Sequence, residues 1–266
     1  MKQLALFGVA MIGRRMEFLV LGLILSLMAV PAGTVSLTHL SEYDISLGIL
    51  PIAKASFASE FGSRDYRITG SFRSWGIADI ITRISAKTQA HGQRRGDELQ
   101  TERFSLVYKS GKRTRVYEVS YRNGNVTRSV MKPEPKRPEN WVPVTDADLR
   151  SVLDPLSGLV FDGDSTVCPR TVPIYDGESR MDLVLAPKGI RNFSTKGFEG
   201  EAIVCEIRYI PRSGFRRGRS DIEFLRNTRM EIWFAKAQSV NVYAPVYARI
   251  PTRMGPVYVK AARYGG

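Results

Sequence analysis

The sequence predicts a mainly β protein, built as a long curled antiparallel sheet (an open half-barrel or β-spiral) with two or three short helices. Apolar and polar residues alternate with a period of two through most of the chain after residue 40, which is typical of half-buried antiparallel strands. Asn123-Gly124 and Asp176-Gly177 separate such alternating runs, and both pairs favour tight hairpin turns. Neither half of the chain has an obvious closed core of its own, so the pattern favours one continuous sheet.

The chain begins with the pattern of an export signal. Arg14-Arg15 precede an uncharged, leucine-rich run over residues 18–30, and this run ends in Val30-Pro31-Ala32. At about 1.5 Å per residue the run reaches about 20 Å, too short for a hydrocarbon core of about 30 Å. We predict that residues 1–32 are a signal peptide cleaved after Ala32 and that residues 33–266 form one exported, periplasmic domain without a stable transmembrane span. The alternative is an uncleaved anchor, because no Asp, Glu, Lys or Arg occurs between residues 18 and 40.

The first half of the exported part predicts strands around one helix. Residues 55–61 and 66–73 alternate as half-buried strands. Within residues 75–86 the period changes, because Ile77, Ile80, Ile81 and Ile84 recur at i, i+3, i+4 and i+7. This spacing predicts an amphipathic helix of about three turns. Further strands are expected at residues 101–108, 114–121 and 126–131, the last two joined through Asn123-Gly124.

A proline-rich connection over residues 132–143 opens the second half. It is stiff and extended, and it cannot pair in the centre of a sheet. Thr145, with Asp148 three residues later, can cap a short helix that carries Leu149, Val152 and Leu153. The remaining strands are expected at residues 171–175, 181–185, 201–210, 230–235, 240–250 and 256–262.

The chain has two cysteines, Cys168 and Cys205. An exported chain enters an oxidising compartment, so two thiols predict one structural disulfide. Cys205 alternates with Ile203 and Ile207, which places its sulfur on the apolar face of a strand. No C-x-x-C motif is present, so a catalytic redox pair is not expected.

The strongly basic composition indicates anionic partners. Lys and Arg number 39 against 26 Asp and Glu, which gives a net charge of +13, and Arg pairs well with phosphate and carboxylate. The densest cationic segment supplies a candidate anion-binding loop for lipid headgroups or a phosphorylated glycan, comprising Arg212, Arg216, Arg217 and Arg219. A flexible surface loop is the alternative interpretation. Nucleic acid is the partner that such a charge suggests in the cytoplasm, and the export signal argues against it.

A second candidate site is apolar. The expected helix and the inward faces of its neighbouring strands could together border a ligand cavity inside the curled sheet. The residues concerned are Ile77, Ile80, Ile81, Ile84, Phe57, Ile68 and Phe72. The alternative is that these side chains form ordinary packed core.

The motifs indicate no catalytic residue, metal site or cofactor. His39 lies just after the expected cleavage site, which leaves His91 as the one histidine of the folded body. A zinc site needs three or four converging ligands, and one His with two oxidised cysteines cannot supply them. Asp162-Gly163-Asp164-Ser165 favours an exposed turn, because no His follows His91 and the other ligands of a calcium loop are missing. Paired glycosidase carboxylates are defined by their separation in space, so the sequence leaves them open.

An ordered set of short strings resembles a known family. These strings are residues 43–49 (Tyr-Asp-Ile-Ser-Leu-Gly-Ile), Tyr66-x-Ile68, Trp75-Gly76, residues 120–124, Asp154-Pro155-Leu156-Ser157 and Tyr175-Asp176-Gly177. In this order the chain, from about Leu40 to Tyr264, resembles the exported bacterial proteins of domain-of-unknown-function family 3108 (DUF3108). The resemblance implies an envelope location and a curled sheet similar to the half-barrels of periplasmic lipoprotein carriers. It implies no catalytic residues.

These observations lead to one expectation of function and one alternative. We expect a non-catalytic periplasmic protein of the cell envelope that binds a lipid, a lipoprotein or another protein partner for envelope maintenance, with no cofactor and no nucleic acid. The alternative is a hydrolase acting on an envelope polymer. A deep apolar cavity would favour a carrier, a basic patch on a face without a cavity would favour surface binding, and converging carboxylates in a cleft would favour the enzyme.

Overall fold

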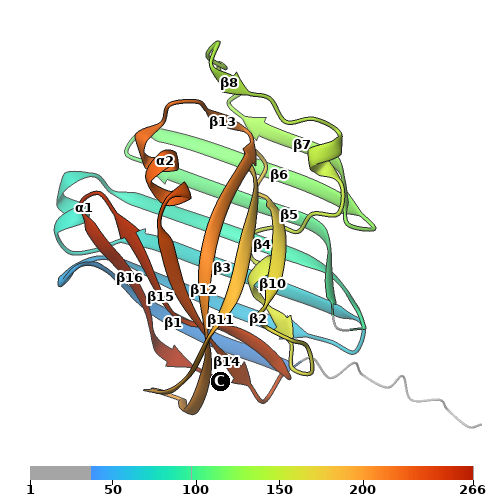
Figure 1. Cartoon of the computed structure of the whole chain (residues 1–266), viewed down its shortest axis with the longest axis vertical. Helices are drawn as coiled ribbons and strands as arrows, with labels where there is room; N and C mark the ends of the chain where they lie inside the picture. Colours follow the sequence, from blue (N-terminus) through green and yellow to red (C-terminus); the bar gives the residue numbers. More distant parts are fainter. Residues whose placement is uncertain (1–36, 97, 266) are drawn as a thin grey trace, which may run out of the picture. The chain divides into compact units, whose positions relative to one another are not determined.

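The fold is one large antiparallel sheet. A computed structural model describes residues 37–96 and 98–265, which lie within one compact unit. The predicted signal peptide, residues 1–32, lies outside the described residues. Fourteen strands form a single continuous sheet (Figure 1), which confirms the mainly β prediction.

The elements follow one another mostly as hairpin neighbours. The first half contains β1 (Leu37–Leu47), β2 (Leu50–Phe61), β3 (Asp65–Ser74), α1 (Ile77–Ile81), β4 (Ile84–Arg95), β5 (Glu98–Ser110), β6 (Arg113–Arg122), β7 (Asn125–Lys132) and β8 (Trp141–Val142). The second half contains the 3-10 turns η1 (Ala147–Leu149) and η2 (Ser157–Leu159), then β9 (Phe161–Asp162), β10 (Arg170–Tyr175), β11 (Arg180–Thr195), β12 (Phe198–Ser213), β13 (Phe215–Arg216), α2 (Ser220–Arg226), β14 (Arg229–Ala237), β15 (Val242–Thr252) and β16 (Gly255–Tyr264). The sheet order is β10-β11-β12-β14-β15-β16-β1-β2-β3-β4-β5-β6-β7, with β9 paired to β15 and β8 paired to β13 in a separate ribbon.

The two predicted hairpin turns form for local reasons. Asn123 and Gly124 both have positive φ, 51° and 75°, which is the backbone of a type I′ turn. In the other turn, the Asp176 side chain accepts hydrogen bonds from the backbone N–H groups of Glu178 and Ser179 at 2.9 and 2.6 Å. Both predictions are confirmed by the antiparallel pairing of the flanking strands.

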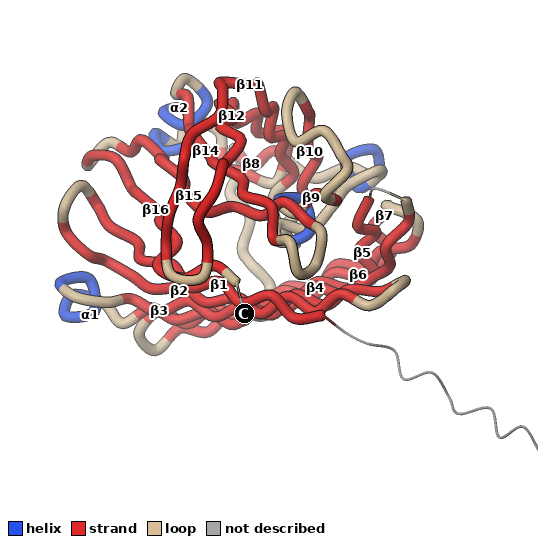
Figure 2. Tube along the Cα trace, turned by 90° about the horizontal axis from the view of Figure 1, so that it is seen from below, coloured by secondary structure: helices blue, strands red, loops and turns tan. Residues whose placement is uncertain are grey.

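Within the described unit the sheet curls into an open half-barrel. Strands β1–β7 form one layer, and β10–β12, β14 and β15 arch over its inner face (Figure 2). The edge strands β7 and β10 meet through side chains, because the Tyr175 hydroxyl lies 3.0 Å from Ser129 Oγ of β7. The Tyr121 hydroxyl of the neighbouring strand β6 donates to the Tyr175 carbonyl at 3.0 Å. Among the described residues no backbone pairing joins the two edges, so the half-barrel stays open.

The proline-rich connection runs between these edges. Its Trp141 and Val142 form β8, which pairs with β13 beyond the end of β12. Arg137 stacks on Trp141 at 4.0 Å and forms an ion pair with Glu178 in the β10–β11 turn. The connection therefore leads the chain from β7 to the opposite layer without entering the main sheet.

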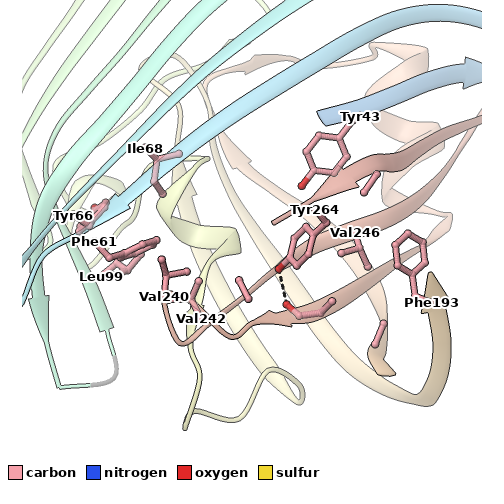
Figure 3. Packing of buried hydrophobic residues seen from close by; sticks show 14 residues of the cluster. Tyr43, Phe61, Tyr66, Ile68, Leu99, Phe193, Val240, Val242, Val246 and Tyr264 are labelled. Carbon is pink, nitrogen blue, oxygen red and sulfur yellow. Dashed lines mark hydrogen bonds between the residues drawn. The ribbon is translucent and has the colours of Figure 1, made fainter. Parts of the chain in front are cut away.

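Residues from both layers form the main core (Figure 3). Tyr43, Phe61 and Ile68 come from β1–β3, and Val246 and Tyr264 come from β15 and β16. The Tyr264 hydroxyl donates to the Ala235 carbonyl at 2.7 Å, and the Tyr43 hydroxyl donates to the Pro245 carbonyl at 2.6 Å. The layers are thus joined by apolar packing and by hydrogen bonds that satisfy the buried hydroxyls.

The chain itself fills much of the interior. The segment of residues 144–168, hereafter the filling segment, runs between the layers. Val152 and Leu156 of this segment pack against Phe104 and Val119 of β5 and β6. Phe161 and Val167 pack with the strands of the opposite layer. The inner face of the half-barrel is therefore largely covered by the chain's own side chains.

Two helices predicted from the sequence are much shorter in the structure. The helix expected over residues 75–86 shrinks to α1, five residues long, because Gly76 adopts φ 61° before it and Thr82 is extended after it. Ile84 begins β4 and pairs with Ser110 of β5. The sequence pattern did not indicate β4, because its inward residues Ala86, Ala90 and Gly92 are too small to mark an apolar face. The helix expected after Thr145 is only the turn η1, in which Asp148 Oδ2 accepts from Thr145 N at 2.9 Å.

Candidate functional site

A cleft of about 500 Å³ lies where the filling segment meets the ends of β5 and β10. Its walls come from four parts of the chain: the start of β5, the β6–β7 turn, the filling segment and β10. The lining residues are Glu98, Leu99, Gln100, Asn123, Gly124, Ser151, Val152, Leu153, Ser157, Val160, Phe161, Arg170, Thr171, Val172 and Pro173. The cleft combines buried apolar residues with exposed polar ones.

One wall of the cleft has an unusual backbone. Ser151 has φ 51°, a region that non-glycine residues other than Asn and Asp seldom adopt. Its N–H donates to Asn125 Oδ1 at 3.1 Å, and the N–H of the next residue, Val152, donates to the Gly124 carbonyl at 2.8 Å. These bonds hold the filling segment against the β6–β7 turn, so the turn and the strained serine share one wall.

A buried polar network lies beneath the cleft. Asp154 is 0% exposed. Its carboxylate accepts from the Thr101 hydroxyl at 2.6 Å and from the backbone N–H groups of Leu156 and Ser157 at 2.8 and 3.1 Å. The Ser157 hydroxyl in turn lies 2.7 Å from the Tyr66 hydroxyl, and burial raises the pKa of Tyr66 well above its ordinary value. The Asp-Pro-Leu-Ser string thus anchors the filling segment to β3 and β5, a structural role that the sequence alone did not reveal.

One cation lies on the rim of the cleft. The Arg170 guanidinium stacks over the Phe161 ring at 4.8 Å, and no ion pair of Arg170 occurs among the described residues. The nearby Arg94 is different, because it donates to Asp162 Oδ2 at 2.9 Å. Arg170 therefore remains available to an anionic group in the cleft.

The predicted apolar cavity does not form. Ile77, Ile80 and Ile81 on α1 are exposed to solvent, and Ile84 is half-buried in β4. The remaining three predicted residues face the inner side of the sheet: Ile68 is core, Phe57 packs against Tyr43, and Phe72 is half-buried. The prediction is wrong because the helix expected over residues 75–86 is only five residues long in the structure. This short α1 buries none of its isoleucines against the sheet.

Phe57 does border a different hollow. This hollow, about 510 Å³, extends across β1 to β5. Most of its other lining residues are small or polar, including Ser56, Thr69, Ser71 and Ser105. None of the other predicted cavity residues lines it, so it is not the cavity that the sequence predicted.

The predicted anion-binding arginines divide into two pairs. Arg212 donates to the buried Asp182 at 2.7 Å, and Arg219 forms an ion pair with Asp221. Burial would raise the pKa of Asp182, but hydrogen bonds from Arg180 and Arg212 outweigh it and lower the pKa. Arg216 lies in β13 and Arg217 in the turn after it; both are exposed, and no ion pair of either occurs in the described part of the chain. The segment expected to be a loop, either anion-binding or merely flexible, instead contains the short ribbon strand β13 and leads into α2.

The predicted disulfide is present in the structure. Cys168 and Cys205 form a disulfide pair with Cα atoms 6.3 Å apart, which joins the end of the filling segment to β12.

The prediction for His39 is wrong. His39 was expected outside the folded body, but it lies in β1 and is 2% exposed. Burial lowers its pKa to about 4. His91 lies on β4 outside the cleft, where burial and the nearby Arg67 and Arg103 lower its pKa.

The described residues include no cluster of three or more His, Cys, Asp or Glu side chains placed to hold a metal. Within the same residues, no helix has the length and apolar character needed to span a bilayer. Glu98 is the one acid among the described lining residues of the cleft.

Comparison with curated proteins gives no match. Among solved structures, the chain is similar to a β-barrel-like protein of domain of unknown function DUF1849 from Brucella abortus, with a TM-score of 0.46 and 9% identity over 87% of this chain and 98% of the other. A family model described as "Protein of unknown function (DUF3108)" matches residues 42–262. The resemblance inferred from the short strings is therefore confirmed, and the chain belongs to the DUF3108 family.

Proposed function

We propose that the chain is a non-catalytic protein of the cell envelope that binds an amphipathic envelope molecule in the cleft, either a lipid or the lipid-modified end of a lipoprotein. The observation that carries this proposal is Arg170, held over Phe161 at the rim without an ion pair among the described residues. An arginine in this setting suits the phosphate or carboxylate of a ligand headgroup.

The rest of the cleft supports a ligand with one apolar and one polar end. Its volume of about 500 Å³ falls in the usual range for small-molecule sites, about 300–1,000 Å³. Leu153, Val160 and Pro173 are half-buried and supply apolar surface, while Gln100 and Asn123 supply polar groups. The strained backbone of Ser151 adds support, because such strain concentrates at ligand sites.

The hydrolase alternative lacks comparable support. Glycoside hydrolysis uses two carboxyl groups that face one another across the scissile bond. Glu98 is exposed, and it is the one acid among the lining residues that the structure describes. The binding function is therefore the better-supported proposal.

The test combines extraction with titration. Protein purified from the cell envelope should yield a stoichiometric lipid on solvent extraction and mass spectrometry. A fluorescent fatty acid should bind saturably, and Arg170→Gln should weaken binding about tenfold, because it removes one charge-assisted pair. Arg191→Gln, at an exposed arginine of β11 outside the cleft, is the matched control and should bind like the unaltered protein. Equal binding by both variants, or no saturable binding, would refute the cleft as the lipid site.

A further inference from the structure

We propose that one end of the sheet is a docking surface for an anionic phospholipid membrane. The surface consists of four chain segments: the β1–β2 turn, the connection that contains α1, the β5–β6 turn and the β15–β16 turn. They are hereafter called the α1 end. This inference concerns a different surface from the cleft and does not depend on the ligand proposed there.

Strand pairing brings the four segments to the same edge. The β15–β16 turn meets the β1–β2 turn through a bond from Gly48 N to the Pro256 carbonyl at 2.8 Å. Trp75 N donates to the Ile52 carbonyl at 2.8 Å, which joins the connection that contains α1 to the start of β2. Gly111 N donates to the Arg83 carbonyl at 3.1 Å, which joins the β5–β6 turn to the same connection. The α1 end is thus a continuous, hydrogen-bonded row, and α1 is seen at this edge in both views of the chain (Figures 1 and 2).

Large apolar side chains project from this row into solvent. Ile49 is 96% exposed, Ile80 85%, Met254 82% and Ile81 78%. Most of the large hydrophobic residues that the described structure leaves exposed lie here, because Leu50, Trp75 and Ile77 belong to the same row. Single exposed apolar residues are ordinary, but a cluster of this kind marks an interaction site.

Cations surround these apolar side chains. The four segments and the adjoining strand ends carry two acids: Asp44, which forms an ion pair with Lys54 at 3.2 Å, and Asp79, which is bound to Ser74 and lies near Arg83. The cations there number eight: Lys54, Arg73, Arg83, Lys109, Lys112, Arg113, Arg249 and Arg253. Lys54 and Arg73 lie 5.1 and 5.2 Å from the centre of the Trp75 ring. Each Lys or Arg near an anionic membrane surface adds to the electrostatic attraction.

The combination fits a membrane better than a protein partner. The apolar side chains protrude from separate turns and from α1. The long cationic side chains beside them can reach lipid headgroups while the apolar atoms enter the boundary of the acyl chains. Trp75 has the place that tryptophan favours, at the interface between apolar and charged groups. A protein interface, in contrast, is depleted of Lys at its centre.

The test uses the protein purified from the cell envelope and two kinds of vesicle. It should co-sediment with vesicles of phosphatidylcholine mixed with phosphatidylglycerol, and binding should weaken as salt is raised. Pure phosphatidylcholine vesicles should bind it at least about tenfold more weakly, because the electrostatic attraction is lost. The double variant Ile80→Ser, Ile81→Ser should reduce binding to the anionic vesicles at least about tenfold, since two apolar anchors are removed.

Controls separate docking from folding and from the cleft. Ile190→Ser alters an isoleucine of β11 that is also exposed, 58%, but lies outside the α1 end, so it should bind vesicles like the unaltered protein. The Ile80, Ile81 double variant should keep its unfolding midpoint and its fatty-acid affinity. Arg170→Gln should keep its vesicle affinity. Vesicle binding that is absent, independent of phosphatidylglycerol, or unchanged in the double variant would overturn the inference, as would loss of vesicle binding together with unfolding. Self-association through this face in place of vesicle binding would do so too.

Discussion

Replacing His39 by phenylalanine should remove much of the loss of stability on mild acidification. His39 lies on β1 against the Tyr264 ring, with ring centres 4.3 Å apart, and neither imidazole nitrogen has a hydrogen-bond partner among the described residues. Charging such a group is unfavourable, so burial lowers its pKa from 6.5 to about 4. Phenylalanine can keep the aromatic contact with Tyr264 but cannot take up a proton.

The size and sign of the effect follow from proton linkage. In the unfolded chain His39 takes up its proton near pH 6.5, whereas in the folded chain it resists until about pH 4. Between these values the unfolded state binds more protons, so the free energy of unfolding falls as the pH falls. The contribution of neutral His39 is therefore fully present above pH 6.5 and lost by pH 4. A shift of this size corresponds to about 3 kcal/mol.

Urea unfolding of the unaltered protein and of His39→Phe at a series of pH values between 7.5 and 4 provides the assay. Other groups also titrate in this range, including the carboxylates, so the informative quantity is the difference between the two proteins. That difference should shift in favour of His39→Phe by about 3 kcal/mol on going from pH 7.5 to pH 4. His91→Gln, at a half-buried position outside the core, should leave most of the pH dependence in place. Identical pH dependence in His39→Phe and the unaltered protein would refute the reasoning.

Three further predictions concern the leader, the disulfide and the core. Envelope-derived protein should begin at Gly33 on N-terminal sequencing, and a chain that starts at Met1 would mean that the leader is retained. Replacing both Cys168 and Cys205 by alanine opens a crosslink between residues 37 apart and should lower the free energy of unfolding by about 4 kcal/mol; native protein with two titratable thiols would contradict the pairing. Ile68→Ala should cost about 2–5 kcal/mol in chemical unfolding, while Ile81→Ala, exposed on α1, should change stability by less than about 0.5 kcal/mol. Equal costs for these two variants would contradict the assignment of core and surface.

The strands and hairpins that the sequence predicted correctly depend on short-range patterns. Alternation at residues 66–73 or 114–121 reports a half-buried strand, whichever strand lies beside it. Asn123-Gly124 specifies its turn through the positive φ that both residues tolerate. The Cys168–Cys205 pair could be predicted for another reason, since two thiols allow only one intramolecular pairing.

Features that depend on which strand lies alongside were beyond these patterns. The isoleucines at 77–84 have helical spacing, but pairing of Ile84 with Ser110 in β5 takes the end of the segment into a strand. In β4, Ala90 is fully buried and Gly92 approaches the backbone of β5 closely, so small size marks a tightly packed strand that looks polar in sequence. His39 is core only because Tyr264, 225 positions further along, returns beside it.

The candidate sites follow the same division. Composition determined that the chain is strongly cationic, and the pattern of the first residues predicts an export signal. Which cations remain free was decided by tertiary contacts, because Asp182 binds Arg212 whereas Arg170 stacks on Phe161. The cleft and the α1 end exist only because antiparallel registry brings residues from distant turns to a common edge. Local sequence thus determines which segments become strands. The register between strands decides which side chains come into contact, and these contacts determine which residues are buried and which remain available for binding.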